Sequence, residues 1–330
     1  MLDHGGRLRE AAAHYNIPLA DWLDLSTGIN PQAWPVPTLP PDCWQRLPET
    51  GDGLEEAAAD YYGNANLLPV AGSQAAIQLL PTLLPRAVVA CLSPIYAEHP
   101  QAWQRAGHKV RFLQNATLSR ALAAATPYVL LCNPNNPTAD HHPRELAVDA
   151  AAQLKKRGGW LIVDEAFIDA TPEESLAPLA GTAAAPNLIV LRSLGKFFGL
   201  AGARVGFLFA APDLLGRLAE AMGPWTVAGP SRVTARLALH DRDWQAVARL
   251  HLLAASQRLA SLLAPLGETK SSPLFVTLNL PQSGELHAHL AAQGILVRRF
   301  DQHPLLRFGL PGDEADWQRL NRALADWKPQ

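Results

Sequence analysis

Cysteine is scarce in this sequence, and the motifs that give cysteine a metal-binding or redox role are missing. The chain has 330 residues but only 3 cysteines, Cys43, Cys91 and Cys132, and no two of them form a C-x-x-C pair. An odd number at these spacings argues against a disulfide framework and against a zinc site, so we predict no bound metal. Such a chain suits a reducing compartment, and we expect a cytoplasmic protein.

Long apolar runs and a strong excess of charge are also absent. No stretch approaches the roughly 18–20 apolar residues that cross a bilayer, and the first residues are polar, unlike a signal peptide. The formal net charge is −2, which argues against nucleic acid or a membrane as the main partner. A regulator with a DNA-binding helix-turn-helix would need a basic module that the first thirty residues are too few to form. We therefore expect a soluble protein.

Two familiar nucleotide-binding motifs are missing as well. A P-loop reads G-x-x-x-x-G-K-[ST], whereas here Val190 occupies the first glycine position and Phe197 follows the lysine. The fingerprint G-x-G-x-x-G is absent, because "GLAGARVG" (199–206) has the wrong spacing and precedes its strand. The sequence supports neither ATP nor NAD.

The sequence does contain a series of short apolar segments separated by helical spans. Apolar runs lie within 85–94, 128–138, 158–167, 187–196 and 204–212, and helices are predicted at 53–62, 73–84, 97–106 and 144–157. This alternation is typical of parallel strands covered on both faces, so we predict a mainly parallel α/β sheet.

The pattern changes after about residue 225. Two long helical spans reach about residue 265, and short strands and helices follow to the end of the chain. We predict a large α/β domain over residues 31–225. A smaller α+β domain is predicted over 226–330, together with the N-terminal segment 1–30.

Six lysines occur, and one of them has an unusual setting. Lys196 lies in "SLGKFFGLAGARVGF" (193–207), after a predicted buried strand and among glycines and large apolar residues. The other five lie at a helix end, at a strand start, in a loop and in the tail. Because lysine is rarely buried without a partner, Lys196 is the candidate for an amine used in chemistry.

Polar side chains follow three of the predicted strands. Asn133 to Asn136 follow one strand, Asp164 and Glu165 follow the next, and Ser193 and Lys196 follow the third. Ligands bind beyond the carboxyl ends of the strands in open parallel sheets. The sequence therefore predicts one site at which these groups converge.

This set of groups fits a lysine that forms a Schiff base with pyridoxal 5′-phosphate. Such a site needs an amine, a carboxylate at the pyridine nitrogen and a cradle for the phosphate. Lys196 and Asp164 are the predicted catalytic residues. The other predicted cofactor-binding residues are Gly72, Ser73 and Gln74 at a helix start, Ser193 and Arg204 for the phosphate, Tyr96 for stacking, and Asn136 for the 3′-oxygen.

Taken in order, "AGSQ", "SPIYAEH", "NPNNPT", "DEAF", "SLGKFFGLAGARVG" and "GILVR…LLRFG" resemble the fold-type I pyridoxal-phosphate-dependent aminotransferases. The resemblance covers nearly the whole chain. It implies a fold-type I transferase with a large mainly parallel-sheet α/β domain and a smaller α+β domain. It also implies a homodimer with the active site near the subunit interface.

Within that family, the opening "HGGRLREAA" (4–12) and "DLSTGINP" (24–31) resemble the threonine-phosphate decarboxylases of cobalamin biosynthesis. The second likeness is to histidinol-phosphate aminotransferases, which typically have a tyrosine where this chain has Phe167. The resemblance thus implies decarboxylation of L-threonine O-3-phosphate, and transamination stays open as the alternative.

The same resemblance assigns substrate-binding roles. Arg298 would bind the substrate phosphate and Arg307 its carboxylate, since a guanidinium forms two parallel charge-assisted hydrogen bonds to either group. The remaining substrate-binding residues that it implies are His4, Gly5, Asn30 and Asn136. One position departs from the family pattern: Leu47 stands where related enzymes have a tyrosine that reaches the neighbouring subunit's cofactor phosphate.

Overall fold

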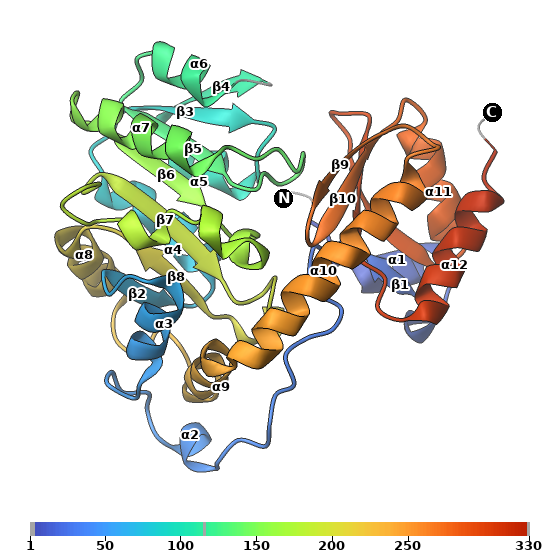
Figure 1. Ribbon diagram of the computed structural model, residues 1–330, viewed down its shortest axis with the longest axis horizontal. Helices are drawn as coiled ribbons and strands as arrows, with labels where there is room; N and C mark the ends of the chain where they lie inside the picture. Colours follow the sequence, from blue (N-terminus) through green and yellow to red (C-terminus); the bar gives the residue numbers. More distant parts are fainter. Residues whose placement is uncertain (1–3, 115–116, 329–330) are drawn as a thin grey trace. The chain divides into compact units, whose positions relative to one another are not determined.

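The structure is a computed structural model that describes residues 4–114 and 117–328. Contacts divide the chain into two compact units. Figure 1 labels the helices and strands and colours them along the sequence. The larger unit comprises Trp34–Asn136 and Asp140–Ala246, and the smaller unit comprises Met1–Ala33, Pro137–Ala139 and Val247–Gln330.

The larger unit is built on one twisted sheet. Within the described residues it has seven strands in the order β2-β8-β7-β6-β5-β3-β4. The strands are β2 (Leu67–Val70), β3 (Val88–Ser93), β4 (Lys109–Gln114), β5 (Tyr128–Cys132), β6 (Trp160–Asp164), β7 (Leu188–Ser193) and β8 (Gly206–Phe209). Strand β8 runs antiparallel to both of its neighbours, and the other pairings are parallel.

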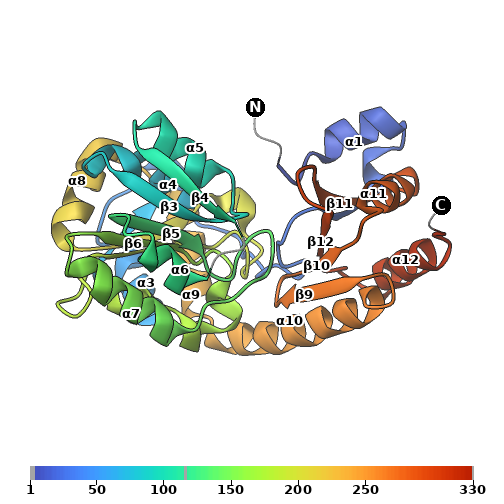
Figure 2. The same ribbon diagram turned by 90° about the horizontal axis from the view of Figure 1, so that it is seen from above.

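Helices cover both faces of this sheet, with α4 and α5 on one side and α7 on the other (Figure 2). The helices of this unit are α2 (Asp42–Gln45), α3 (Leu54–Tyr62), α4 (Ser73–Leu83), α5 (Glu98–Arg105), α6 (Leu118–Ala123), α7 (Arg144–Lys155), α8 (Pro212–Met222) and α9 (Gly229–His240). Trp103 of α5 packs with Leu130, Ile162 and Ile189 of the sheet in one buried cluster. The central strands are buried on both faces, which explains their continuous apolar runs.

The smaller unit has a five-stranded sheet among its described residues, in the order β1-β11-β12-β10-β9. Its strands are β1 (Leu23–Leu25), β9 (Glu268–Ser272), β10 (Phe275–Asn279), β11 (Ile295–Phe300) and β12 (Leu305–Gly309). Its helices are α1 (Leu8–Tyr15), α11 (Ser283–Ala292) and α12 (Glu314–Ala325), and α10 (Arg242–Leu263) begins in the larger unit. The N-terminal segment joins this unit because β1 pairs in parallel with β11.

Short 3₁₀ turns complete the list of elements. They are η1 (Leu19–Asp21), η2 (Ile168–Ala170), η3 (Pro172–Glu174), η4 (Ala177–Leu179) and η5 (Ala201–Ala203). Among the helices that the structure describes, none combines the length and the apolar character needed to cross a bilayer.

The predicted fold class, a large mainly parallel α/β domain with a smaller α+β domain, is confirmed. The boundary between the units, however, falls after Ala246 and not after residue 225. Helix α9 belongs to the larger unit. Its Arg232 donates hydrogen bonds to Asp52, which precedes α3, and to Glu55, which lies in the first turn of α3. The change in sequence pattern after residue 225 coincides with the approach to α9, the first of the two long helices. The ion pairs of Arg232 nevertheless hold this helix against the larger unit.

Candidate active site

The carboxyl ends of β5, β6 and β7 lie side by side, as the sequence predicted. Cys132 is paired with Asp164, and Asp164 is paired with Leu191, in neighbouring parallel strands. Just past the strand ends, the Asn133 N–H donates to the carbonyl of Asp164 at 2.9 Å. The polar residues that follow these strands are therefore delivered to one edge of the sheet.

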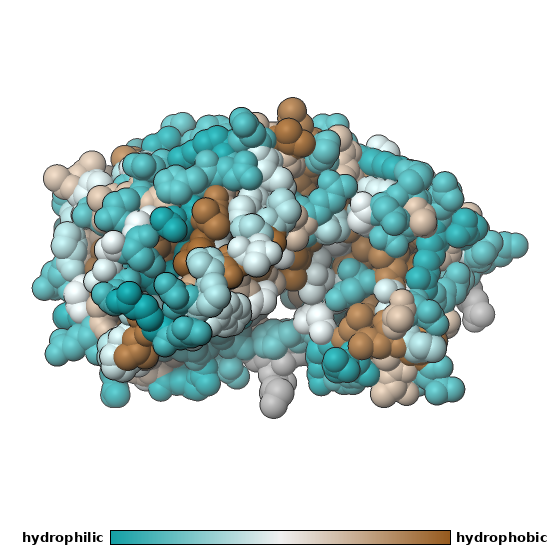
Figure 3. Space-filling model, turned by 90° about the horizontal axis from the view of Figure 1, so that it is seen from below, coloured by the Kyte–Doolittle hydropathy of each residue, from teal (hydrophilic) through white to brown (hydrophobic). Residues whose placement is uncertain are grey.

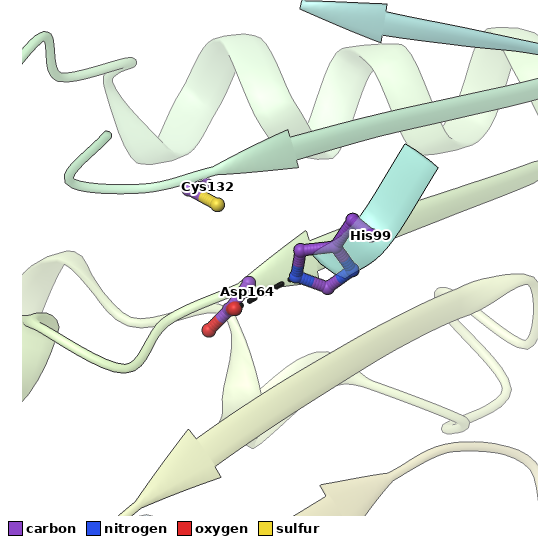
Figure 4. A group of neighbouring side chains, drawn as sticks. All are labelled: His99, Cys132 and Asp164. Carbon is purple, nitrogen blue, oxygen red and sulfur yellow. Dashed lines mark hydrogen bonds and ion pairs between the residues drawn. The ribbon is translucent and has the colours of Figure 1, made fainter. Parts of the chain in front are cut away.

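Asp164 is buried at that edge and has a histidine partner that the sequence analysis did not identify. Asp164 Oδ2 and His99 Nε2 lie 2.8 Å apart in a hydrogen bond, and Oδ1 accepts from the N–H of Ala166 at 3.0 Å. Figure 4 shows His99 reaching from α5 toward the end of β6. The sequence held one hint, since His99 closes the motif "SPIYAEH" three residues after Tyr96. Nothing in the sequence links it to a carboxylate 65 positions away.

Cys132 stands beside this pair, and the three ligand atoms lie within 4.8 Å of one another. That spacing alone would suit a metal ion. Burial, together with the nearby Asp164 carboxylate, raises the pKa of the Cys132 thiol well above its usual value. His99 Nε2, however, is already bonded to Asp164 Oδ2 at 2.8 Å. We interpret the group as a hydrogen-bonded pair beside a neutral thiol.

The start of α4 and the end of β7 form a cradle shaped for an anion. Gly72 precedes α4 with a φ of +70°, and no side chain caps the first N–H groups of this helix. A Cβ on Gly72 would lie 2.5 Å from the guanidinium of Arg204, and one on Gly206 would lie 2.6 Å from the Ser73 nitrogen. Ser193 pairs with Gly206 across the strands. Uncapped N–H groups, a guanidinium and a hydroxyl are what a phosphate monoester needs.

Arg204 itself has a φ of +53°, which non-glycine residues rarely adopt. Left-handed backbone at a residue with a long side chain costs about 1–3 kcal/mol and persists where the surroundings require it. Here it lies in the turn after η5, where the guanidinium reaches Gly72. The strain supports a role for Arg204 in binding.

Lys196 faces an aromatic ring at this site. Its amine lies 5.3 Å from the centre of the Phe167 ring, within the range of a cation–π interaction. The lysine is partly buried, as expected for an amine that is used in chemistry.

Tyr96 and Asn136 belong to two loops that are tied together. The Asn135 side chain donates to the Pro94 carbonyl at 2.9 Å, which joins the loop after β5 to the loop that carries Tyr96. Tyr96 donates to Gln74 Oε1 at 3.4 Å, and Gln74 donates to Glu98 at 2.8 Å. Burial first, and then Glu98, raises the pKa of Tyr96 to about 12, so its hydroxyl is neutral.

In the smaller unit, two arginines face one another across a pair of strands. Arg298 of β11 is directly opposite Arg307 of β12, and Thr277 of β10 is opposite Arg307 on the other side. Directly opposed like charges destabilise a strand pair. This arrangement indicates that an anion belongs on this face of the sheet.

The glycines of the "HGG" opening are explained by close packing in the same unit. A Cβ on Gly5 would lie 2.3 Å from the Ser26 carbonyl oxygen, and Gly6 has a φ of +78°. The Gly6 N–H donates to Ser26 Oγ at 2.7 Å.

A cavity of about 460 Å³ brings His4, Gly5 and Arg298 together. Arg307 and Asn30 are not among the described residues that line it. Arg307 is buried and donates to the Ser26 carbonyl at 2.9 Å, and Asn30 accepts from the Gln32 N–H at 2.9 Å.

The larger unit has an α/β sheet in which the uncapped start of α4 lies beside the Arg204 guanidinium, and comparison with known proteins gives the family. The model for "Aminotransferase class I and II" matches residues 45–324. The chain therefore belongs to the class I and II aminotransferase family, and the family predicted from the sequence is confirmed.

Several relatives are named threonine-phosphate decarboxylase, and two of them match nearly the whole chain. The protein from Pseudomonas aeruginosa is 54% identical over 99% of this chain and 98% of its own length. The protein from a Sinorhizobium species is 44% identical over 98% of this chain and 97% of its own length. Among solved structures, histidinol-phosphate aminotransferase from Sinorhizobium meliloti, in complex with pyridoxal-5′-phosphate, has a TM-score of 0.82 at 21% identity, covering 98% of this chain and 94% of that one. At that identity the likeness concerns the fold.

Proposed function

We propose that this chain is a pyridoxal-phosphate-dependent decarboxylase that converts L-threonine O-3-phosphate to (R)-1-amino-2-propanol O-2-phosphate for cobalamin biosynthesis. The observation that carries the proposal is the 54% identity over 99% of the chain to a protein named threonine-phosphate decarboxylase. The packed "HGG" turn supports it, because a Cβ on Gly5 would lie 2.3 Å from the Ser26 carbonyl oxygen and Gly6 has a φ of +78°. The opposed Arg298 and Arg307 suit a substrate with two anionic groups.

The residues of the larger unit fit pyridoxal phosphate. Lys196 would hold its aldehyde, and Asp164 would hold its pyridine nitrogen protonated while His99 keeps the carboxylate in place. The phosphate would bind at Gly72, Ser73, Gln74, Ser193 and Arg204, with Tyr96 against the ring and Asn136 at the 3′-oxygen. When bound, the cofactor supplies an electron-withdrawing ring that stabilises negative charge at the substrate α-carbon.

The protein decides which bond at that carbon breaks by holding the substrate's anionic groups. We assign the phosphate to Arg298, with His4 and Gly5 of the same cavity, and the carboxylate to Arg307, with Asn30 and Asn136 as further substrate residues. If the bond from the α-carbon to the carboxylate stands perpendicular to the ring, that bond breaks, CO₂ leaves and a proton is added at the α-carbon. If the bond to the α-hydrogen stands there, transamination follows with Lys196 moving the proton.

We further propose a cytoplasmic homodimer. Trp44, Leu47 and Trp225 are large apolar side chains with exposed fractions of 68%, 62% and 57%. Trp44 lies in α2 and Leu47 lies just after it. Helix α2 packs closely on the start of α9, as shown by Gly229, where a Cβ would come within 2.3 Å of the Cys43 carbonyl oxygen. Figure 3 shows one face of the molecule, on which hydrophobic residues lie among hydrophilic ones. Light scattering after size exclusion is expected to give twice the chain mass of 35.6 kDa, and a monomer would contradict this proposal.

The reaction is tested with purified protein loaded with pyridoxal phosphate and given L-threonine O-3-phosphate without any keto acid. We expect many turnovers of CO₂ release, and aminopropanol phosphate as the product in mass spectrometry. Absence of CO₂, with turnover of histidinol phosphate once 2-oxoglutarate is added, would instead identify the aminotransferase reaction.

The first prediction concerns the cradle: Gly72→Ala is expected to weaken pyridoxal phosphate binding about tenfold or more. The added Cβ would displace the Arg204 guanidinium, which lies 2.5 Å from that position, and hydrogen bonds to charged groups are worth about 1.5–3 kcal/mol. Fluorescence titration of the cofactor measures the change. Gly202→Ala is the matched control, because a Cβ there meets no atom within 4 Å; equal affinities in the two variants would contradict the assignment.

The second prediction concerns the histidine partner: His99→Leu is expected to lower kcat about tenfold. The substitution removes the 2.8 Å hydrogen bond to Asp164, and a bond to a charged group is worth about 1.5–3 kcal/mol. His99→Gln keeps an N–H donor and should recover part of the rate. The pH dependence of the absorbance of the bound cofactor should shift in the leucine variant, and an unchanged profile would show that His99 does not act on Asp164.

A further inference from the structure

A buried ion cluster lies at the ends of β6 and β7. Arg192 Nη1 donates to Glu165 Oε2 at 3.0 Å, and its Nη2 donates to Asp169 Oδ1. The side chains of all three residues are at most 1% exposed. Arg192 precedes Ser193 and Glu165 follows Asp164, and successive strand residues point to opposite faces of a sheet. The cluster therefore lies behind the candidate cofactor residues.

The cluster is tied into its surroundings on several sides. Glu165 accepts hydrogen bonds from Ser175 Oγ at 2.6 Å and from the Leu176 N–H at 2.7 Å. Asp169 accepts from Tyr61 Oη at 3.0 Å, and the guanidinium of Arg192 lies 4.6 Å from the centre of the Tyr62 ring. These bonds fix the segment after β6 to β7 and to α3.

Stability alone does not account for such a cluster. It places two carboxylates and one guanidinium out of water, and burial raises the pKa of Glu165 even though Arg192 opposes this. Replacing buried ion pairs by apolar side chains of similar volume is often neutral or stabilising. What the charges provide is a fixed orientation of the side chains: the two nitrogens of the Arg192 guanidinium bind one carboxylate each and fix the direction of both.

What the cluster orients is the ring that faces Lys196. Phe167 lies midway between Glu165 and Asp169 along the chain, so Arg192 holds the short segment on both sides of it. The Phe167 ring is buried, and its centre is 5.3 Å from the Lys196 amine. Lys196 itself follows Arg192 by four positions.

We propose that Arg192 is a positioning residue: by binding Glu165 and Asp169 it fixes the Phe167 ring against the Lys196 amine and holds that amine in one orientation. The inference rests on the proposed function of Lys196 as the lysine that binds the cofactor. In this arrangement the Phe167 ring covers one side of the Lys196 amine.

The test needs a variant that does not leave bare charges in the interior. Arg192→Met combined with Glu165→Gln and Asp169→Asn removes every charge of the cluster, whereas Arg192→Met alone would leave two buried carboxylates. Arg192→Lys keeps the positive charge but lacks the two-pronged guanidinium, so it should orient the ring only in part and change the labelling of Lys196 less than the cluster variant does. The matched control is the same treatment of a second arginine that binds two carboxylates: Arg232→Met with Asp52→Asn and Glu55→Gln, where Arg232 joins α9 to the α3 region.

The first readout is the rate at which acetic anhydride labels Lys196 in the full chain before the cofactor is added, measured by mass spectrometry against the exposed Lys155. We expect the cluster variant to label at least about threefold faster, because the ring no longer covers the amine. The control variant should label as the unmodified chain does. After loading, the pH at which the cofactor absorbance changes should shift in the cluster variant only.

Unchanged labelling in the folded cluster variant, or an equal change in the control variant, would overturn the proposal. If the cluster variant does not fold, Arg192→Lys decides the question, since it keeps one positive charge but cannot bind Glu165 and Asp169 through two separate nitrogens as the guanidinium does. It must then label Lys196 faster than the unmodified chain does. These readouts do not depend on the reaction catalysed. Failure of the proposed function would be seen separately, as absence of CO₂ from the unmodified enzyme.

Discussion

Replacing Lys196 by alanine is expected to lower kcat for CO₂ release from L-threonine O-3-phosphate by at least about 10³-fold. The amine has two tasks in the proposed reaction, binding the cofactor aldehyde and moving a proton, and a positioned proton-transfer group alone contributes about 10²–10⁴-fold. The Lys196 amine lies against the Phe167 ring at the edge of the sheet where β5, β6 and β7 end. CO₂ release under saturating cofactor and substrate measures the loss.

Lys155→Ala is the matched control for this prediction. Lys155 is an exposed lysine in the last turn of α7, where it faces solvent, and its removal should leave kcat within about twofold. The Lys196→Ala variant should also lack the absorbance of a cofactor bound to an amine. Retention of that absorbance, or a rate near that of the control, would mean that another amine carries the cofactor.

The sequence predicted the arrangement of the site because that arrangement follows from topology. Once β5, β6 and β7 are recognised as buried parallel strands, their carboxyl ends must share one edge of the sheet, and Asp164, Ser193 and Lys196 come with them. Continuous apolar runs made these strands visible in the sequence.

Partnerships between distant residues could not be predicted in the same way. The bond between His99 and Asp164 and the pairing of Arg192 with Glu165 depend on how a helix packs on the sheet and on which face a side chain takes. An arginine in a strand carries no signal of its own, and the position of His99 at the end of "SPIYAEH" does not indicate which carboxylate it contacts. The pairing of such residues with a carboxylate becomes visible only in the folded structure.

Strands without an apolar pattern were missed for a related reason. Strand β9, "ETKSS", is polar and mostly exposed, and it forms because it pairs with β10 at the edge of its sheet. Strand β2 contains Pro69, which indicates a loop in a sequence but is compatible with an edge strand. In both cases tertiary pairing outweighs local preference.

The two opposed arginines of the smaller unit are expected to bind different anionic groups of the substrate. Arg307→Leu is expected to raise KM for L-threonine O-3-phosphate about 100-fold or more, because two hydrogen bonds to a charged group are lost at about 1.5–3 kcal/mol each. Arg298→Leu should have an effect of similar size. The two residues are direct cross-strand partners, so substrate affinity alone does not tell which anion each one binds.

Inhibition by the product distinguishes the roles of the two arginines, since aminopropanol phosphate keeps the phosphate and has lost the carboxylate. Inhibition by added product should therefore weaken about 100-fold in Arg298→Leu and stay within about twofold in Arg307→Leu. Urea unfolding of both variants controls for folding, because Arg307 also donates to the Ser26 carbonyl. The reverse pattern would exchange the two roles. Equal weakening in both variants would mean that the phosphate lies between the guanidinium groups and that the carboxylate is bound elsewhere.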